Sequence, residues 1–554
     1  MKPNPMTPWR RLINLLKLDR RDVKQIFYYA IFAGLVNLSL PLGIQAIINL
    51  IQGAQISTSW IILVILVTAG VAFVGILQLM QFRITENIQQ KIFTRSSFEF
   101  AYRFPKIKMS ELRNFYPPEL ANRFFDTLTV QKGITKILLD FPAALLQILF
   151  GLILLSFYHP FFIIYGILLL VLIYIIFKYT ARRGMETSLE ESKHKYRIAH
   201  WIQEIARSVI SFKLSGKTQL AMNKSDALVT QYLDARESHF KVLVLQFIQM
   251  ITFKTLVTAG LLLIGGILVL NQEMNIGQFV AAEIIILLII NAVEKLILRL
   301  ESFYDVLTSL EKMGQVVDKE LESQEGSNPF DEVTSFQVEL DQVGYRVSKS
   351  KRQLLYNINL RLDQTSRVVI QGPSGSGKST LLHLISGIVE PTEGSMYIND
   401  FSMKGIHLNS YRAVLGQTLS DESPFEGTIL DNITFGDKAI SKKAIRDVIT
   451  ITGLTDFIKE QPNGMETVIY PEGKQISSTV ARKIVLARSM VREPKLLLLQ
   501  DPFGQFVQEE KQRLIAYITS SERPWGLVVV SQGDDWLPFC NQQIRMENGT
   551  IVSN

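Results

Sequence analysis

The sequence contains one cysteine, Cys540, among 554 residues, which excludes an internal disulfide. Chains without disulfides are typical of reducing compartments, so we expect Cys540 on a cytosolic face, as a small buried apolar side chain. Lysine and arginine are missing from three short stretches, 52–57, 158–160 and 271–275, each of which joins two long apolar runs. Short links without basic residues are typical of extracytoplasmic loops in membrane proteins.

The apolar runs explain a composition that is 47% hydrophobic. Each run is close to or longer than the roughly 20 residues needed to cross the hydrocarbon core of a bilayer. The predicted spans are about 25–51, 58–82, 137–157, 161–177, 243–270 and 276–298. The long segments between spans, 83–136 and 178–242, are rich in lysine and arginine. The distribution of basic residues therefore predicts an integral protein of the plasma or inner membrane, with both long segments and both termini cytoplasmic.

Residues 8–18 form an amphipathic pattern just ahead of the first span. Trp9, Leu12, Ile13 and Leu16 share one helical face, and Arg10, Arg11 and Lys17 share the other. This pattern predicts a helix lying in the membrane interface, with an ordinary soluble amphipathic helix as the alternative. The basic cytoplasmic segments also account for the net charge of +7, so we expect no nucleic-acid partner.

Three charged residues, Lys254, Glu283 and Glu294, fall inside predicted spans. A charge facing lipid costs about 2.5–3.5 kcal/mol on insertion scales, so these side chains are predicted to face the bundle interior or a cavity. Lys254 and Glu294 lie at similar depth and are expected to pair, whereas Glu283 lies nearer the outside. A structural ion pair and a contact to a transported substrate both remain open.

The motif on which the functional prediction depends is a phosphate-binding loop. It consists of Gly372, Pro373, Ser374, Gly375, Ser376, Gly377, Lys378, Ser379 and Thr380. The loop follows an apolar strand, 368–370, and opens onto a helical pattern, which is the strand–loop–helix setting that such a loop requires. Backbone N–H groups and the helix N-terminus would hold phosphate oxygens. Lys378 would neutralise the β- and γ-phosphates, and the Ser379 hydroxyl would ligate Mg²⁺.

The remainder of the chain alternates strands with helical stretches. A polar segment, 317–334, is predicted to link residues 1–316 to a nucleotide-binding domain at 335–554. Strands are predicted at 336–347, 354–362, 496–499 and 527–531, and Asn548-Gly549 marks a terminal hairpin. The predicted fold class is a six-span α-helical transmembrane domain joined to an α/β P-loop domain.

Six spans followed by a P-loop domain with this order of motifs resemble an ABC transporter of the exporter class, in half-transporter form. The membrane half is most similar to the haemolysin-secretion and multidrug or lipid-flippase branches. The resemblance implies a homodimer or heterodimer in which ATP lies between the phosphate loop of one subunit and the signature motif of the other. Independently of the resemblance, the long basic segments carry helical periodicity, so we expect the spanning helices to continue well beyond the bilayer. Their far ends, near 116–126 and 206–216, are expected to contact a cytoplasmic domain, with ordinary turns between helices as the alternative.

The family's motifs transfer to this sequence unevenly. Gln417 matches the glutamine that completes the Mg²⁺ shell and senses the γ-phosphate, and the residues after it match as well. The position of the adenine-stacking aromatic falls on Val347, which has no ring. Tyr345 is the candidate replacement, or it fills a structural aromatic position of the family.

The hydrolytic motifs depart further from the family. The signature aligns with 476–480, where Ser477 is kept for a partner's γ-phosphate but both glycines are lost. At the Walker B position, Gln500 replaces the aspartate associated with Mg²⁺ and Asp501 replaces the catalytic glutamate. In an alignment shifted by one residue, Asp501 is the Mg²⁺ partner and Pro502 stands at the base position, so one acid is missing either way. Gln532 stands at the position of the switch histidine. Loss of a general base typically lowers a rate 10²–10⁴-fold, so this nucleotide-binding domain is predicted to be degenerate.

Two functions follow. In the first, the chain is an ATP-binding exporter subunit that moves an unidentified substrate outward, with little hydrolysis at its own site. In the second, it is a hydrolysis-impaired regulatory or structural subunit that uses ATP to stabilise a dimer. ATP and Mg²⁺ are the expected cofactors, and lipid, drug and peptide cargoes all remain open.

Overall fold

The computed structural model describes residues 6–52, 58–113, 115–323, 325–330, 335–347, 352–504 and 506–553. The chain forms two compact units: Met1–Pro105 with Phe115–Lys319, and Lys106–Asn114 with Glu320–Asn554. The described residues of the first unit include six helices that are long and apolar enough to cross a membrane. The second unit contains β-sheets with helices around them. The predicted fold class is therefore confirmed.

The described part of the first unit is helical. Its helices are α1 (Pro8–Leu18), α2 (Arg20–Asn37), α3 (Ser39–Gln52), α4 (Thr58–Arg103), α6 (Pro117–Ala121), η2 (Asn122–Phe125), α7 (Asp126–Ser156), α8 (Phe161–Arg207), α9 (Val209–Leu214), α10 (Leu220–Leu270), α11 (Ile276–Leu298) and α12 (Leu300–Val317). At 46, 47 and 51 residues, α4, α8 and α10 are far longer than a bilayer requires. The prediction that spanning helices continue well beyond the membrane is confirmed.

The first predicted span, 25–51, is two helices rather than one. Helix α2 ends at Asn37 and α3 begins at Ser39. The physical reason is Pro41, which has no N–H to donate to the carbonyl of residue 37 and whose ring crowds the preceding turn. The break follows from one residue that the hydropathy pattern does not register.

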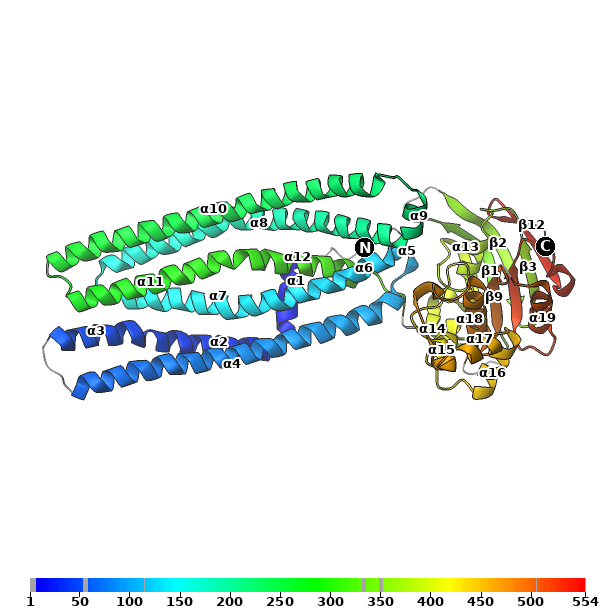
Figure 1. Ribbon diagram of the computed structural model, residues 1–554, viewed down its shortest axis with the longest axis horizontal. Coiled ribbons are helices and arrows are strands. Elements are labelled where there is room, and N and C mark those ends of the chain that lie inside the picture. The colour runs from blue at the N-terminus through cyan, green and yellow to red at the C-terminus, as the bar shows by residue number, and fades with distance from the viewer. Residues whose placement is uncertain are drawn as a thin grey trace. The chain divides into compact units, whose positions relative to one another are not determined.

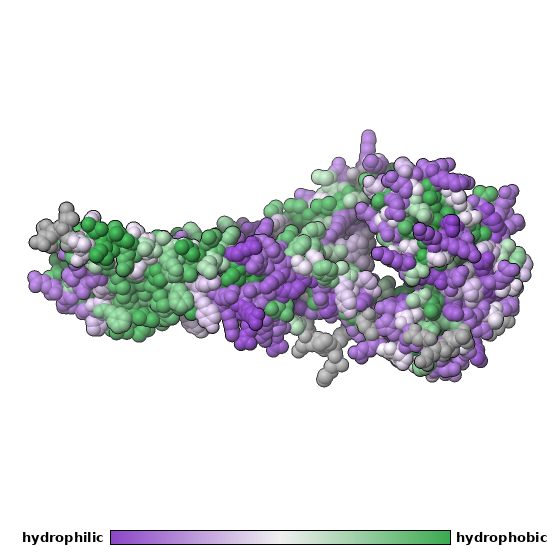
Figure 2. Space-filling view, turned by 90° about the horizontal axis from the view of Figure 1, so that it is seen from below, coloured by the Kyte–Doolittle hydropathy of each residue, from purple (hydrophilic) through white to green (hydrophobic). Residues whose placement is uncertain are grey.

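Long helices lie side by side in pairs: α8 with α10, α7 with α11, and α2 with α4 (Figure 1). One core cluster joins apolar residues of α7, α8, α10 and α11, including Leu155, Leu169, Val257 and Ile289. Hydrophobic side chains cover the end of this unit that carries the turns at 157–160 and 271–275, and hydrophilic ones follow farther along (Figure 2). The surface therefore matches the predicted division of these helices into membrane spans and polar extensions.

Helix α1 has the predicted bounds, but its faces are divided differently from the prediction. Arg11, predicted on the polar face, is mostly buried and pairs with Asp318 and Glu311 of the α12 region. Trp9 is 55% exposed, although its ring makes an edge contact with Phe303 at 5.3 Å. The prediction for Arg11 was wrong because acidic partners distant in sequence stabilise its charge inside the unit.

The second unit contains twelve strands and eight α-helices in its described residues, besides short 3-10 helices. The strands are β1 (Gln337–Arg346), β2 (Gln353–Asp363), β3 (Arg367–Gln371), β4 (Glu393–Ile398), β5 (Phe401–Ser402), β6 (Leu415–Thr418), β7 (Gly427–Thr428), β8 (Val468–Ile469), β9 (Leu496–Gln500), β10 (Gly526–Val530), β11 (Gln542–Glu547) and β12 (Thr550–Ser553). The helices are α5 (Met109–Leu112), α13 (Lys378–Ile385), α14 (Leu408–Ala413), α15 (Ile429–Thr434), α16 (Lys442–Ile451), α17 (Thr455–Glu460), α18 (Ser478–Met490) and α19 (Gln508–Thr519).

The strands form a four-stranded sheet, β2-β1-β4-β5, a six-stranded sheet, β12-β11-β3-β10-β9-β6, and the small pair β7-β8. In the six-stranded sheet, β11, β3, β10, β9 and β6 are parallel neighbours. Val368 and Ile370 of β3 join the core shared with the four-stranded sheet, and Val369 joins the core under the helices of the opposite face. Burial on both faces explains why these strands read as continuous apolar runs.

Three local predictions meet different outcomes. The terminal hairpin is confirmed: β11 and β12 pair around Asn548 and Gly549, both with positive φ. Residues 106–113 group with the second unit, where Ile107 bridges Leu321. The segments 116–126 and 206–216 belong to the first unit, and their contact with a cytoplasmic domain stays a prediction. Cys540 is half-buried against the core, and burial raises the pKa of its thiol to about 11.

The predicted pairing of Lys254 with Glu294 is confirmed. Lys254 Nζ of α10 lies 3.2 Å from Glu294 Oε2 of α11, with side chains 48% and 30% exposed. Glu283 is half-buried on the same helix, α11. Because a charge facing lipid is costly, the prediction that this pair faces the bundle interior or a cavity still stands as a prediction.

We expect Lys254→Met and Glu294→Gln each to destabilise the chain, because each leaves an unpaired charge inside a span, at a cost of about 2.5–3.5 kcal/mol. The double variant should lose less than the sum of the singles, because replacing both partners of an ion pair is often close to neutral. Unfolding of the full chain in lipid nanodiscs measures the coupling. The pair Arg182–Glu186 on α8, 91% and 62% exposed, is the control and should show almost none. Equal coupling at the two pairs would contradict the prediction.

Candidate functional site

The parallel strands of the six-stranded sheet end at one edge, and the predicted site residues follow them there. Ile370 of β3 lies opposite Val530 of β10, which lies opposite Gln500 of β9. Thr418, the last residue of β6, lies opposite Leu499. The phosphate loop, Gln500 with Asp501, Gln532 and Gln417 are therefore gathered at the carboxyl edge of the sheet, where open α/β sheets bind ligands.

The three glycines of the phosphate loop are needed for different reasons. A Cβ on Gly372 would lie 2.1 Å from the Met546 carbonyl oxygen, and one on Gly377 would lie 2.8 Å from Leu355 Cδ2. Gly375 has open space around it but a φ of +81°. Gly372 and Gly377 permit close packing of the loop against neighbouring strands, and all three glycines adopt a positive φ that the loop requires. Helix α13 then starts at Lys378, directly after Gly377.

Lys378 folds back over the loop from which it projects. Its ammonium donates to the carbonyl oxygens of Gly372 at 2.7 Å and Pro373 at 2.8 Å, and to Ser376 Oγ at 3.3 Å. Burial lowers the pKa of Lys378, and the charge of Asp501 partly offsets this effect. The positive charge is therefore held at the mouth of the loop, where phosphate oxygens would compete with backbone carbonyls for it.

Gln500 is the residue of β9 that contacts the phosphate loop. Its Nε2 donates to Ser379 Oγ at 2.9 Å, while its Oε1 is buried and has no hydrogen-bond partner among the described residues. The contact decides between the two alignments of this motif, because Gln500, and not Asp501, occupies the position beside the loop serine. An uncharged amide thus stands where the family pattern has a carboxylate.

Asp501 is exposed and has a positive φ of 40°. Its backbone N–H donates to the Val530 carbonyl at 2.9 Å, and its carbonyl accepts from Arg482 Nη1 at 2.9 Å. These two bonds fix the chain as it leaves β9. Gln532, one residue beyond Ser531 at the end of β10, is likewise exposed.

A cavity of about 440 Å³ opens beside these groups. Its walls include Gln500 and Asp501, the segment after β6, and the first turns of α18 with Arg482. Glu422 also lines it, and burial raises the pKa of that carboxyl. The cavity therefore joins the Walker B position to the start of the signature helix within the second unit.

Ser477 is the N-cap of α18, and its exposed side chain accepts a hydrogen bond from Val480 N at 3.2 Å. Ser478 and Thr479, which replace the family's two glycines, have negative φ in the first turn of the helix. Their backbone is therefore unstrained by the replacement. What the two side chains change is the space in front of the helix N-terminus, where an anion would approach.

Tyr345 lies on β1, opposite Leu355 of β2. Its ring packs against the core of the second unit, and its hydroxyl accepts from Arg113 Nη1 at 3.4 Å. It lines a cavity of about 240 Å³ together with Lys108 and the segment 387–392. These contacts suit the structural aromatic position that the sequence left open, whereas adenine stacking by Tyr345 stays a prediction. The neighbouring residues 348–351 lie outside the described residues.

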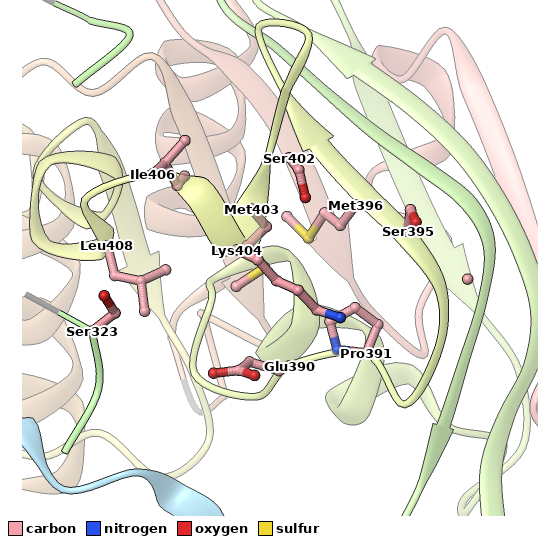
Figure 3. A pocket seen from close by; sticks show the side chains of 11 residues that line it. Ser323, Glu390, Pro391, Ser395, Met396, Ser402, Met403, Lys404, Ile406 and Leu408 are labelled. Carbon is pink, nitrogen blue, oxygen red and sulfur yellow. The ribbon is translucent and has the colours of Figure 1, made fainter. Parts of the chain in front are cut away.

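A smaller cavity of about 100 Å³ lies beside β4 and β5 (Figure 3). It is lined by Ser323, Glu390, Pro391, Gly394, Ser395, Met396, Ser402, Met403, Lys404, Ile406 and Leu408. None of these residues belongs to the phosphate loop. It is therefore separate from the nucleotide site.

The sequence did not predict how the segment after Gln417 is held. Asn432 is fully buried and exchanges hydrogen bonds with the backbone of Phe425, and Arg488 donates to Asn432 Oδ1 at 2.9 Å and to its carbonyl at 2.7 Å. The Arg488 guanidinium also lies over the rings of Phe425 and Phe435. Both residues were visible as parts of family matches, but their contact depends on folding.

Known proteins resemble both units. A family model described as "ABC transporter" matches residues 355–504, and one described as "ABC transporter transmembrane region" matches residues 26–293. An alpha-hemolysin translocation ATP-binding protein, HlyB, of Escherichia coli O157:H7 is 27% identical over 306 residues, which cover 55% of this chain and 43% of HlyB. A putative export ATP-binding/permease protein of Rickettsia bellii is 25% identical over 335 residues, covering 60% and 58%.

An ATP-dependent lipid A-core flippase of Bordetella avium is 25% identical over 281 residues, covering 50% of this chain and 47% of the flippase. The chain thus spans about half the length of the curated relatives that it matches. Among solved structures, a bacterial Atm1-family ABC exporter with ATP bound has a TM-score of 0.85 over 96% of this chain and 94% of that one. At 16% identity, this likeness shows the fold alone.

Asn432→Ala should lower the free energy of unfolding by about 2–4 kcal/mol, because it leaves the Phe425 backbone and part of Arg488 without partners in a buried site. Thermal unfolding of the full chain measures the loss. Asn463→Ala, at an exposed asparagine whose side chain makes no cap hydrogen bond, is the matched control and should change stability by less than about 0.5 kcal/mol. Similar losses in the two variants would show that the Asn432–Arg488 contact contributes little.

Proposed function

We propose that this chain, an exporter-type half-transporter of the ABC transporter family, binds ATP at its phosphate loop and helps to move an unidentified substrate outward. It does so as one subunit of a homodimer or heterodimer, in the plasma or inner membrane. Residues 1–316 form the transmembrane domain and 335–554 the cytoplasmic nucleotide-binding domain, joined by 317–334. The basic segments and both termini face the cytoplasm.

The observation that carries the proposal is the contact of Gln500 Nε2 with Ser379 Oγ. In the family, phosphate is bound by backbone N–H groups, the start of the helix after the loop and a lysine. This chain has all of these groups, in the loop, in α13 and in Lys378. The groups that would promote hydrolysis are side chains, and here they are an amide at 500, a shortened acid at 501 and an amide at 532. The geometry therefore favours binding over hydrolysis at this chain's own loop.

The groups present fit a triphosphate better than they fit Mg²⁺. Ser379, Gln417 and Gln500 would offer only uncharged oxygens, and the Gln500 N–H already points at the serine oxygen that would ligate the ion. Mg²⁺ in phosphate-transfer sites is usually held by one or two carboxylates together with the phosphates. The expected Mg²⁺ is therefore not used in the mechanism.

In a dimer, the start of α18 faces the other subunit's nucleotide by the family's arrangement. The Ser477 hydroxyl and the α18 N-terminus then approach the γ-phosphate on a partner with an intact Walker B acid. We place hydrolysis at that composite site, where the missing acid and histidine of this chain do not matter. Ser478 and Thr479 add side-chain bulk there, which makes this half of the site less favourable than the family's two glycines.

A second candidate function follows from the same contact. A chain that binds ATP without cutting it can stabilise a dimer in its closed form and regulate transport without powering it. The two functions differ in whether transport by the dimer requires nucleotide at this chain's own loop.

The purified full chain should bind ATP, and Lys378→Ala should weaken binding about 10- to 100-fold, because charge-assisted hydrogen bonds contribute about 1.5–3 kcal/mol. Titration with a fluorescent ATP analogue measures this. Lys438→Ala, at an exposed lysine elsewhere in the second unit, is the control and should bind normally.

The lone chain should hydrolyse ATP at least about 10²-fold more slowly than the restored variant Gln500→Asp/Asp501→Glu/Gln532→His. Phosphate release by the two proteins in nanodiscs measures the difference. Rapid ATP hydrolysis by the unaltered chain, abolished by Lys378→Ala, would contradict the prediction that this site is degenerate.

A further inference from the structure

The hydroxyl of Ser379 is the atom of the phosphate loop that a divalent cation would use, and it is already engaged. Gln500 Nε2 donates a hydrogen bond to it at 2.9 Å, so a partly positive N–H group stands where a carboxylate would attract a cation. The other end of the amide, Oε1, is buried without a partner among the described residues. Gln500 therefore brings no net negative charge to the Ser379 side of the site.

The other side chains near this point do not replace the missing charge. Gln417, at the end of β6, is uncharged, and no cluster of three histidine, cysteine or acidic side chains that could hold a metal exists in the described part of the chain. Asp501 places its negative charge near Lys378 rather than against Ser379: it is exposed, its backbone is held by bonds to Val530 and Arg482, and no hydrogen bond joins it to Ser379 among the described residues.

The groups that attract phosphate are positive and need no metal. The Lys378 ammonium sits at the mouth of the loop, 2.7–2.8 Å from two carbonyl oxygens that an anion would displace. The start of α13 adds backbone N–H groups, with the turn opened by Gly375 and Gly377. Free ATP carries more negative charge than its magnesium complex, so these positive groups should attract free ATP at least as strongly as they attract the complex.

We propose that Gln500 makes nucleotide binding by this chain independent of divalent cations. The inference rests on the proposed function, because it assumes that the loop binds ATP. A carboxylate at position 500 would add attraction for Mg²⁺ across a few ångströms of partly buried space, which favours the magnesium complex over free ATP. The amide removes this preference while Lys378 and the loop backbone keep their hold on the phosphates. Gln500 is thus the residue that sets which form of the nucleotide is preferred.

The test is the affinity of the full chain in nanodiscs for a fluorescent ATP analogue, measured in excess Mg²⁺ and again in EDTA. The unaltered chain should show affinities within about threefold of each other. Gln500→Glu, which changes the amide to a carboxylate of the same length, should bind at least about tenfold more tightly in Mg²⁺ than in EDTA. Gln417→Glu is a comparison variant at the same edge of the sheet, and Gln364→Glu, at a half-buried glutamine whose side chain donates to the Pro524 carbonyl, is the matched control.

Each outcome has one meaning. A tenfold or larger loss in EDTA by the unaltered chain overturns the inference and leaves the proposed function intact. Equal behaviour of the unaltered chain and Gln500→Glu shows that residue 500 does not set the preference and also overturns it. Absence of binding in both buffers removes the proposed function itself. Thermal unfolding without nucleotide verifies that Gln500→Glu is folded, and Gln500→Asp repeats the test with a shorter acid.

Discussion

The parallel pairing of β3, β10 and β9 is the constraint on which the second unit depends. These strands are buried on both faces, so their side chains are apolar and their polar chemistry can appear only where each strand ends. Parallel order places those ends at one edge, which brings the loop at 372–380 next to Gln500 although more than a hundred residues separate them. The same order makes the residue type at position 500 important for the phosphate loop, because its side chain donates a hydrogen bond to Ser379.

Phosphate binding and ATP hydrolysis in a site of this kind rely on different parts of the chain. Phosphate binding depends on the backbone conformation of the loop, which requires glycine at positions 372, 375 and 377. Cleavage depends on individual side chains, each of which a single substitution removes. A protein with such a site could therefore lose hydrolysis and keep nucleotide binding, which is the separation proposed for this chain.

The first unit handles charge by pairing it. Arg11 is held by two acids near the end of α12, and Lys254 by Glu294 across two spanning helices. In water such pairs contribute little, but inside a span an unpaired charge is costly, so the pairs fix which helices can be neighbours. The Lys254–Glu294 pair keeps considerable exposure, and the cost of a charge in lipid is the reason to expect that face of α10 and α11 to turn away from lipid.

The sequence by itself determined the elements whose signal is local: the six apolar spans, the strand–loop–helix around Lys378 and the Asn548-Gly549 hairpin. It also indicated the depth match of Lys254 and Glu294, because helical rise converts residue number into distance. It did not determine the break before Pro41, the burial of Arg11 or the contact of Asn432 with Arg488, since each depends on a partner or a backbone bond that composition does not register. Only the tertiary structure decided that Gln500, rather than Asp501, faces Ser379, because the pleat of β9 and the turn after it aim the two side chains in different directions.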